Sequence, residues 1–81
     1  MSAERVKTLK AVYTFRATTE AMKMEQCARE HEIPGRLIPV PRQISAGCGM
    51  AWVAPAEAKT RTDEQIRLWG VEVEGFYELL L

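Results

Sequence analysis

The sequence has few of the residues from which several common kinds of fold and site are built. Its two cysteines are too few for a disulfide framework, so we expect reduced thiols and a cytoplasmic location. Its basic and acidic residues are equal in number and form no basic run, which argues against a nucleic-acid partner. No apolar run reaches the ~18 residues of a membrane span, so we expect no membrane partner.

Several catalytic and metal-binding patterns are also missing. The single histidine, His31, follows Cys27 by one helical turn, which is a two-ligand arrangement for a metal. No third ligand is evident nearby, so we favour a structural helix and expect neither a metal nor another cofactor. Ser45 has no histidine at a recognisable spacing, which leaves a Ser/His hydrolase unsupported. The Gly47–Gly49 segment is too short for a phosphate-binding loop and lacks the lysine that would follow.

The length favours one small α+β domain over residues 1–81, with residues 1–7 as a flexible leader. A chain of this size buries only ~60–65% of its unfolded surface, so its stability margin is narrow. Pairing with a second copy would widen that margin.

The first half of the chain changes from a strand period to a helix period. Residues 8–15 alternate between apolar and polar faces and predict a half-buried strand. The helical spacing of Ala21, Met24, Ala28 and His31 predicts the inner stripe of a helix that runs to about Glu32. Thr18 or Thr19 is the expected N-cap. Pro34 and Gly35 then end the helical region.

The second half begins with short strands. We expect one at residues 36–40, at the edge of the sheet because of its proline, and another at residues 48–54. Residues 56–61 fit either a loop or an early helical turn. A capping box that begins at Thr62 predicts a second helix, which ends near Trp69.

Val71 to Leu80 alternates again and predicts the last strand, with a bulge at Gly75. The order β-α-β-β-α-β is that of the ferredoxin-like split βαβ fold, an antiparallel four-stranded sheet with both helices on one face. The expected strand order is 4-1-3-2. The uncovered face, a candidate homodimer surface, is expected to show Val12, Ile38 or Val40, Val53 and Phe76.

The least ordinary stretch joins the two middle strands. Pro39 and Pro41 bracket a valine and stiffen the chain, and Arg42 follows them. Cys48 then lies between Gly47 and Gly49, which leaves its thiol sterically open and frees the neighbouring backbone N–H groups to face what the sulfur carries. This order of residues is not one that core packing requires, and it predicts a site at the cysteine.

The topology also predicts the surroundings of Cys48. The first and third strands are adjacent and antiparallel, so Cys48 is expected beside Phe15, Arg16 and the start of the first helix at Thr18–Glu20. The positive end of that helix, with Arg42 and Arg16, favours an anion such as a thiolate or persulfide there. The alternative is that Cys48 is a small buried residue that begins a strand.

Residues 38–45, followed by Cys48 and Gly49, resemble the signature of a small bacterial family of selenium/sulfur carrier-like proteins. The resemblance covers roughly residues 9–80. It implies that Cys48 carries sulfur or selenium as a persulfide-type adduct, received from a donor such as a cysteine desulfurase and passed to an acceptor protein. Better-understood sulfur carriers of this size place the cysteine in a Cys-Pro-x-Pro motif at a helix N-terminus, whereas here the prolines precede it.

We therefore predict a carrier rather than a turnover enzyme, with Cys48 as the carrier thiol. The residues expected to hold the adduct or stiffen the loop are Pro39, Pro41, Arg42, Ser45, Gly47, Gly49, Arg16, Thr18 and Thr19. A second interpretation is a binding module for a small anion or a protein, in which the thiol does no chemistry. A thiol enzyme is less favoured, because His31 is expected toward the far end of the first helix.

Overall fold

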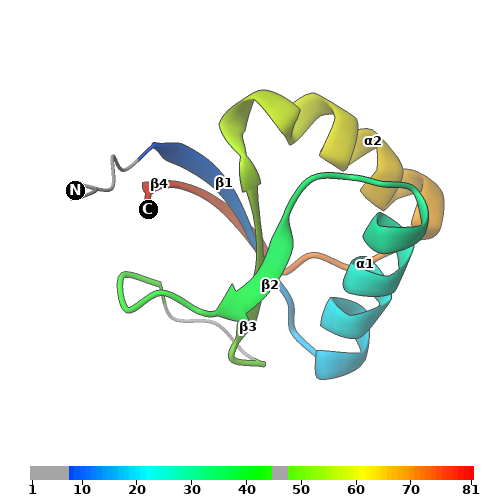
Figure 1. The fold of residues 1–81 in the computed structure, drawn as a ribbon. Helices are drawn as coiled ribbons and strands as arrows, with labels where there is room; N and C mark the ends of the chain where they lie inside the picture. The colour runs from blue at the N-terminus through cyan, green and yellow to red at the C-terminus, as the bar shows by residue number, and fades with distance from the viewer. Residues whose placement is uncertain (1–7, 45–47) are drawn as a thin grey trace, which may run out of the picture.

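The computed structural model describes residues 8–44 and 48–81, which form a four-stranded antiparallel sheet with helices on one face (Figure 1). The elements in chain order are β1 (Leu9–Thr14), α1 (Thr18–Glu30), β2 (Arg36–Pro39), β3 (Met50–Pro55), the 3-10 helix η1 (Ala56–Ala58), α2 (Lys59–Trp69) and β4 (Gly75–Leu80). The strand order is β2-β3-β1-β4. The predicted ferredoxin-like α+β fold and its strand order are confirmed.

β1 is a central strand and is paired along both edges. It runs antiparallel to β3 on one side and to β4 on the other. Ala11, Tyr13 and Phe15 face the helices, as their alternation predicts, and all three are buried. Val12 and Thr14 on the opposite face are buried too. β1 is therefore covered on both faces, and not on one face only as its pattern predicts.

The larger core lies between the sheet and the helices. Trp52 of β3 is a buried member of it, and Met50 packs against it. The buried residues of α1 are Ala21, Met24 and Ala28. His31 was the fourth expected member of that stripe, but it is exposed, and its ring lies against Trp69 with the centroids 5.3 Å apart. α1 has already ended at Glu30, so the helical period no longer applies at position 31.

The second face of the sheet carries a smaller apolar cluster. Its buried members are Val12, Ile44, Ala51 and Val53, with Ile38, Val40, Leu79 and Leu81 packed against them. Val12, Val53 and both of the alternatives Ile38 and Val40 thus lie on the predicted face, but Val12 and Val53 are buried, so this face is not uncovered as predicted. Ile44 belongs to the segment after β2, which lies on the side of the sheet away from the helices (Figure 1). The chain itself therefore covers part of this face.

Phe76 lies on the opposite face from the predicted one. It is paired with Tyr13, which faces the helices, and the two ring centroids are 5.1 Å apart. Lys59 of α2 places its ammonium 4.6 Å from the centroid of the Phe76 ring. Tyr77 is paired with Val12 and takes the outer face instead. β4 is an edge strand with apolar residues on both faces, so its hydrophobic pattern does not identify the inner one.

α1 begins one residue earlier than expected. Ala17 is its N-cap, and no side chain in the described part of the molecule caps the helix. The Ala17 carbonyl accepts hydrogen bonds from the N–H groups of Glu20 and Ala21, at 3.1 and 3.3 Å. The helical bonds thus start at Ala17, which places Thr18 and Thr19 inside the first turn. The prediction of either threonine as N-cap is wrong.

α2 also begins earlier than expected. It starts at Lys59, directly after η1, so Thr62 lies inside the helix, where it is fully buried. The predicted capping box is therefore wrong, and residues 56–61 are helical rather than a loop. Alanine, glutamate and lysine are strong helix formers, which explains the early start. Gly70 ends α2 at φ 71°, in the left-handed conformation that is typical of a helix stop.

The other three strands are shorter than predicted. β2 ends at Pro39, before Val40. β3 begins at Met50 rather than at Cys48, because Gly49 at φ 84° interrupts the extended backbone. Residues 71–74 precede β4, and Gly75 is the first residue of that strand, paired with Thr14. Gly75 is therefore a strand end and not a bulge.

A polar contact joins α2 to the sheet. The Tyr13 hydroxyl donates to Asp63 Oδ1 at 2.7 Å, and the Lys59 ammonium donates to the other carboxylate oxygen. Burial raises the pKa of Tyr13 well above its ordinary value, and the hydrogen bond and charge of Asp63 add to the shift. Burial opposes ionisation of Asp63, but hydrogen bonds from Lys59 and Tyr13 outweigh it and lower the pKa of that carboxyl.

The packing of Gly35 against Trp52 gives a stability prediction. Gly35 has φ 139°, and a Cβ there would lie 2.7 Å from the Trp52 indole, whereas a Cβ at Gly70 would meet open space. We expect Gly35→Ala to lower the free energy of unfolding by about 2–4 kcal/mol and Gly70→Ala by about 1 kcal/mol. Urea unfolding followed by tryptophan fluorescence measures both values. Equal losses in the two variants would contradict the close packing.

The Asp63 contact gives a pH prediction. The pKa of Asp63 is lowered in the folded protein, so its contribution is present above the unfolded value of about 4 and is lost as the pH falls. Asp63→Asn should destabilise the protein at neutral pH by less than about 1 kcal/mol, since the pair is partly exposed to solvent. The difference between the variant and the parent should shrink as the pH falls below about 4. The matched control is Glu64→Gln, an exposed neighbour, for which no such trend is expected.

Candidate functional site

Cys48 lies at the carboxyl end of β1. Its backbone N–H donates to the carbonyl of Phe15 at 3.3 Å, which is the neighbour that the topology predicts. Its side chain packs against the core on the helix side of the sheet. The position of the cysteine is therefore fixed by the central strand, although Cys48 itself precedes β3.

The Cys48 thiol is half-buried and is not part of a disulfide. Its Sγ donates to the carbonyl of Met50 at 3.7 Å, a distance within hydrogen-bond range for sulfur. A deprotonated or sulfur-bearing Cys48 cannot donate in this way, so the contact belongs to the protonated thiol. Cys27 in α1 is also a free thiol, and it provides an internal reference for the reactivity of Cys48.

The loop that carries Cys48 is closed at its base. The N–H of Val40 donates to the carbonyl of Gly49 at 3.0 Å, directly beyond the paired residues Pro39 and Met50. Pro41 accepts a hydrogen bond from the N–H of Ile44 at 3.0 Å, which forms a turn. The two prolines therefore lie at the base of the loop, one at the end of β2 and one at the start of this turn.

Gly49 gives the loop its open side. Its φ of 84° is one that other residues rarely adopt, and a Cβ at this position would lie within 4 Å of no described residue apart from its two neighbours in the chain. The glycine is exposed, directly beside the thiol. In the described part of the chain, therefore, no side chain from another segment packs against the turn at Gly49.

The predicted basic residues differ in their surroundings. Arg16 is exposed and lines a small hollow of about 340 Å³ with Glu72, Val73 and Glu74. Arg42 is exposed and makes no ion pair or hydrogen bond with the described part of the chain. No contact of either guanidinium with Cys48 is seen among these residues. Ser45 and Gly47, two further predicted members of the site, lie outside the described residues.

The first turn of α1 contains an acidic residue, Glu20, whose contacts were not predicted from the sequence. Glu20 accepts a hydrogen bond from the backbone N–H of Glu72 at 2.9 Å and lies 4.0 Å from the Lys23 ammonium. Thr18 and Thr19 are exposed and do not cap the helix. The hydrogen bond between Glu72 and Glu20 joins the segment before β4 to the first turn of α1. The contact could be predicted only from the tertiary arrangement, because Glu20 and Glu72 are remote in the sequence.

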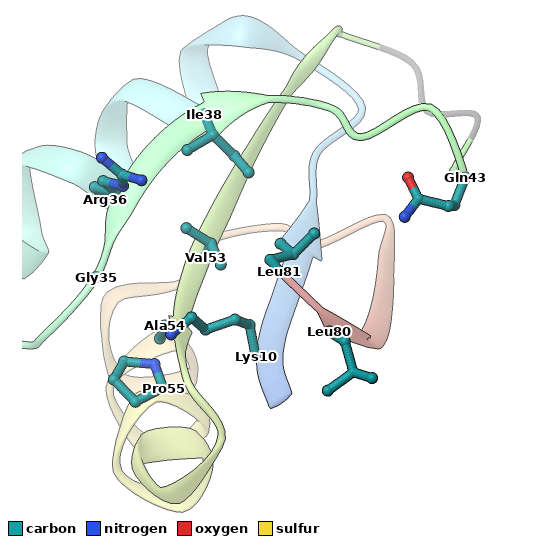
Figure 2. Close-up of a pocket in the computed structure, with 10 residues that line it drawn as sticks. All are labelled: Lys10, Gly35, Arg36, Ile38, Gln43, Val53, Ala54, Pro55, Leu80 and Leu81. Carbon is teal, nitrogen blue, oxygen red and sulfur yellow. The ribbon is translucent and has the colours of Figure 1, made fainter. Parts of the chain in front are cut away.

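A larger hollow than the one at Arg16 lies away from the thiol. It is a groove of about 780 Å³ on the outer face of the sheet, where Ile38, Val53 and Leu81 point toward one another (Figure 2). Lys10 and Arg36 also line it, and neither has a carboxylate partner in the described part of the molecule. Lys10 is paired with Pro55, at the opposite end of β3 from Cys48. The groove and the thiol are therefore separate features.

Residues 8–44 and 48–81 contain neither a metal-binding cluster nor a membrane-spanning helix. No group of three or more histidine, cysteine, aspartate or glutamate side chains could hold a metal ion. No helix in these ranges is long and apolar enough to cross a membrane. The side chain of His31 instead lies 2.9 Å from the carbonyl of Cys27, in the last turns of the helix that His31 follows.

A comparison with protein families gives one match. The family described as "Putative Se/S carrier protein-like" matches residues 10–78, which include both strands beside the thiol and Cys48 itself. No curated protein and no solved structure gives a significant match. The match agrees with the resemblance seen at the proline-rich loop.

The geometry at Gly49 gives a prediction for the reactivity of Cys48. Alanine is disfavoured at φ 84° by about 1–2 kcal/mol, so Gly49→Ala should shift the turn and break the contact between the thiol and Met50. We expect iodoacetamide to alkylate Cys48 several-fold faster in this variant. Peptide mass spectrometry measures the rate at both cysteines, with Cys27 as the internal control. An unchanged ratio of the two rates would show that Gly49 does not control the position of the thiol.

Proposed function

Because the chain belongs to the family of Se/S carrier protein-like chains, we propose that Cys48 holds sulfur or selenium as a persulfide-type adduct and relays it between partner proteins. The family supports a carrier of these elements. The residue and the form of the cargo are the parts that we infer from the site.

The observation that carries the proposal is the way in which Cys48 is held. Its backbone is bonded to Phe15 at the end of the central strand, while no described side chain from another segment packs against its neighbour Gly49. A carrier thiol must keep a fixed position and still be reached by two successive partners. Cys27 lacks this combination, because it lies within the regular backbone of α1.

The transfer that we propose is an exchange between thiols. The Cys48 thiolate attacks the outer sulfur of a persulfide on the donor, and the donor leaves as a thiolate while its S–S bond breaks. An acceptor thiolate then attacks the outer sulfur on Cys48, and the Cys48 thiolate leaves. Each step forms one bond to sulfur and breaks another, so the pair of steps needs no external oxidant or reductant.

Charge and backbone groups would support the adduct. Arg42 is free of partners in the described region and can approach an anionic cargo, and Arg16 lies one residue beyond the carbonyl that holds Cys48. The start of α1 supplies partial positive charge, which Glu20 partly offsets. Loading of the sulfur would replace the contact with the Met50 carbonyl by contacts to these groups.

One observation favours a second candidate function. The hydrogen bond from Cys48 to the Met50 carbonyl suits a structural cysteine, which would make the domain a binding module for a small anion or a protein. In that case the thiol does no chemistry, and Cys48→Ala should retain binding of the partner. A carrier with the same substitution should lose all transfer.

The carrier proposal predicts a change in mass. After incubation with a cysteine desulfurase and cysteine, and removal of the enzyme, the intact protein should gain the mass of one or more sulfur atoms. Cys48→Ala should gain none, whereas Cys27→Ala should gain as much as the parent. Intact-protein mass spectrometry without reductant measures the gain, and a reductant should reverse it.

Two results would contradict this proposal. One is the absence of added sulfur in the parent protein with a donor that loads a known carrier in the same experiment. The other is equal addition to the parent and to Cys48→Ala, which would assign the reaction to Cys27.

A further inference from the structure

β4 forms an unprotected edge of the sheet. Its neighbour is β1, and no other strand of the described chain pairs with it. The sequence Gly75–Leu80 contains no proline, lysine or arginine, which are the residues that usually protect such an edge. The opposite edge is different, because β2 is only four residues long and ends at Pro39. The two edges of this sheet are therefore not equivalent, and β4 is the one that is able to accept a further strand.

The hydrogen bonds of the last residues show which backbone groups of β4 point outward. Thr8 and Leu81 exchange both backbone hydrogen bonds, at 3.3 and 3.1 Å. Bonded pairs alternate along an antiparallel ladder, so Tyr77 and Leu79 also direct their N–H and C=O groups toward β1. The backbone groups of Phe76 and Glu78 must then point away from the sheet.

The side chains of this strand are also apolar and unusually exposed. Phe76 is 38% exposed, Tyr77 37% and Leu80 60%, and they account for half of the six large exposed hydrophobic residues in the described chain. They lie on both faces of β4, because Tyr77 shares a face with Val12, and Phe76 with Tyr13. A strand added at this edge would therefore cover apolar surface on both faces of the sheet.

We propose that β4 pairs antiparallel with β4 of a second copy of this chain, with the twofold axis at Tyr77. The two sheets then join into one continuous sheet, and the outward N–H and C=O groups of Phe76 bond with those of Glu78 of the second copy. Such self-pairing is isologous, since the same five residues from Gly75 to Leu79 contribute on both sides.

Charge selects this register. In a twofold antiparallel pair, the axis passes beside one residue of each strand, and residues opposite each other lie on the same face of the sheet. Tyr77 and Glu78 are the two middle residues of β4, so we compare an axis at each. An axis at Glu78 would place the two Glu78 carboxylates opposite each other, which is unfavourable. An axis at Tyr77 places Glu78 of the second copy opposite Phe76, where the Lys59 ammonium lies 4.6 Å from the ring centroid. The Lys59 side chain is 40% exposed, so it remains open to this carboxylate.

The pairing leaves the thiol clear. Cys48 precedes β3, which lies on the other side of β1 from β4. A second copy at the β4 edge would thus leave both Cys48 loops open to their partners. The dimer does not depend on the carrier chemistry, and either proposal can fail without the other.

The first test is the mass of the protein in solution. Sedimentation equilibrium at micromolar to millimolar concentrations should fit a monomer–dimer equilibrium of the 9.2 kDa chain. Glu78→Lys places a second positive charge beside Lys59 of the other copy, and it should raise the dissociation constant about tenfold. The matched control, Glu64→Lys in α2, makes the same change of charge away from the edge and should leave the constant unchanged. A monomer throughout, or equal effects of both variants, would overturn the proposal.

The second test fixes the register by disulfide trapping. In a Cys27→Ser, Cys48→Ser background, Tyr77→Cys places two thiols in a non-hydrogen-bonded pair, whose Cα atoms are about 4.5 Å apart, so an oxidant should join them rapidly. Glu78→Cys in the same background should form disulfides much more slowly. Faster trapping at position 78 would overturn the register, and equally slow trapping at both positions would overturn the edge pairing.

Discussion

β1 is hydrogen-bonded along both edges, and the arrangement of the whole domain follows from this double pairing. At its carboxyl end, the carbonyls of Thr14 and Phe15 accept hydrogen bonds from two segments that are not strands. Phe15 accepts the N–H of Cys48 on one side, and Thr14 accepts the N–H of Glu74 at 2.7 Å on the other. One end of a buried strand thus positions both the loop that carries the thiol and the segment that leads into β4. The candidate site thus depends on a buried strand that is paired on both sides, although its own residues lie in loops.

Most of the architecture could be predicted from local patterns. The alternation along residues 9–15 and the spacing of Ala21, Met24 and Ala28 identified the inner faces of β1 and α1. The element order then gave the strand order, because a split βαβ arrangement allows few alternatives. The errors arose where two signals compete. Thr62 has the sequence pattern of an N-cap, but residues with strong helix propensity precede it, and the helix extends back over them.

The candidate site could be predicted only in part. Adjacent antiparallel strands brought Cys48 to Phe15, which requires topology and no side-chain detail. The partner of the thiol, the Met50 carbonyl, depends on the φ of Gly49, which the sequence does not specify. The contact of Glu20 with the segment before β4 could not be predicted, because Glu20 and Glu72 are far apart in the sequence. Phe76 was placed on the wrong face because an edge strand with apolar residues on both sides has no single hydrophobic period.

The hydrogen bond between Val40 and Gly49 has a consequence for how this family can diversify. It closes the loop at its base, directly after the last pair of β2 and β3, so the register of the two strands is set before the loop begins. The exposed residues Arg42 and Gln43 can therefore be exchanged without a shift of that register, whereas Ile44 is buried in the outer cluster and Cys48 is bonded to Phe15. Sequence changes among relatives are thus expected at the two exposed positions, and not at the two anchored residues.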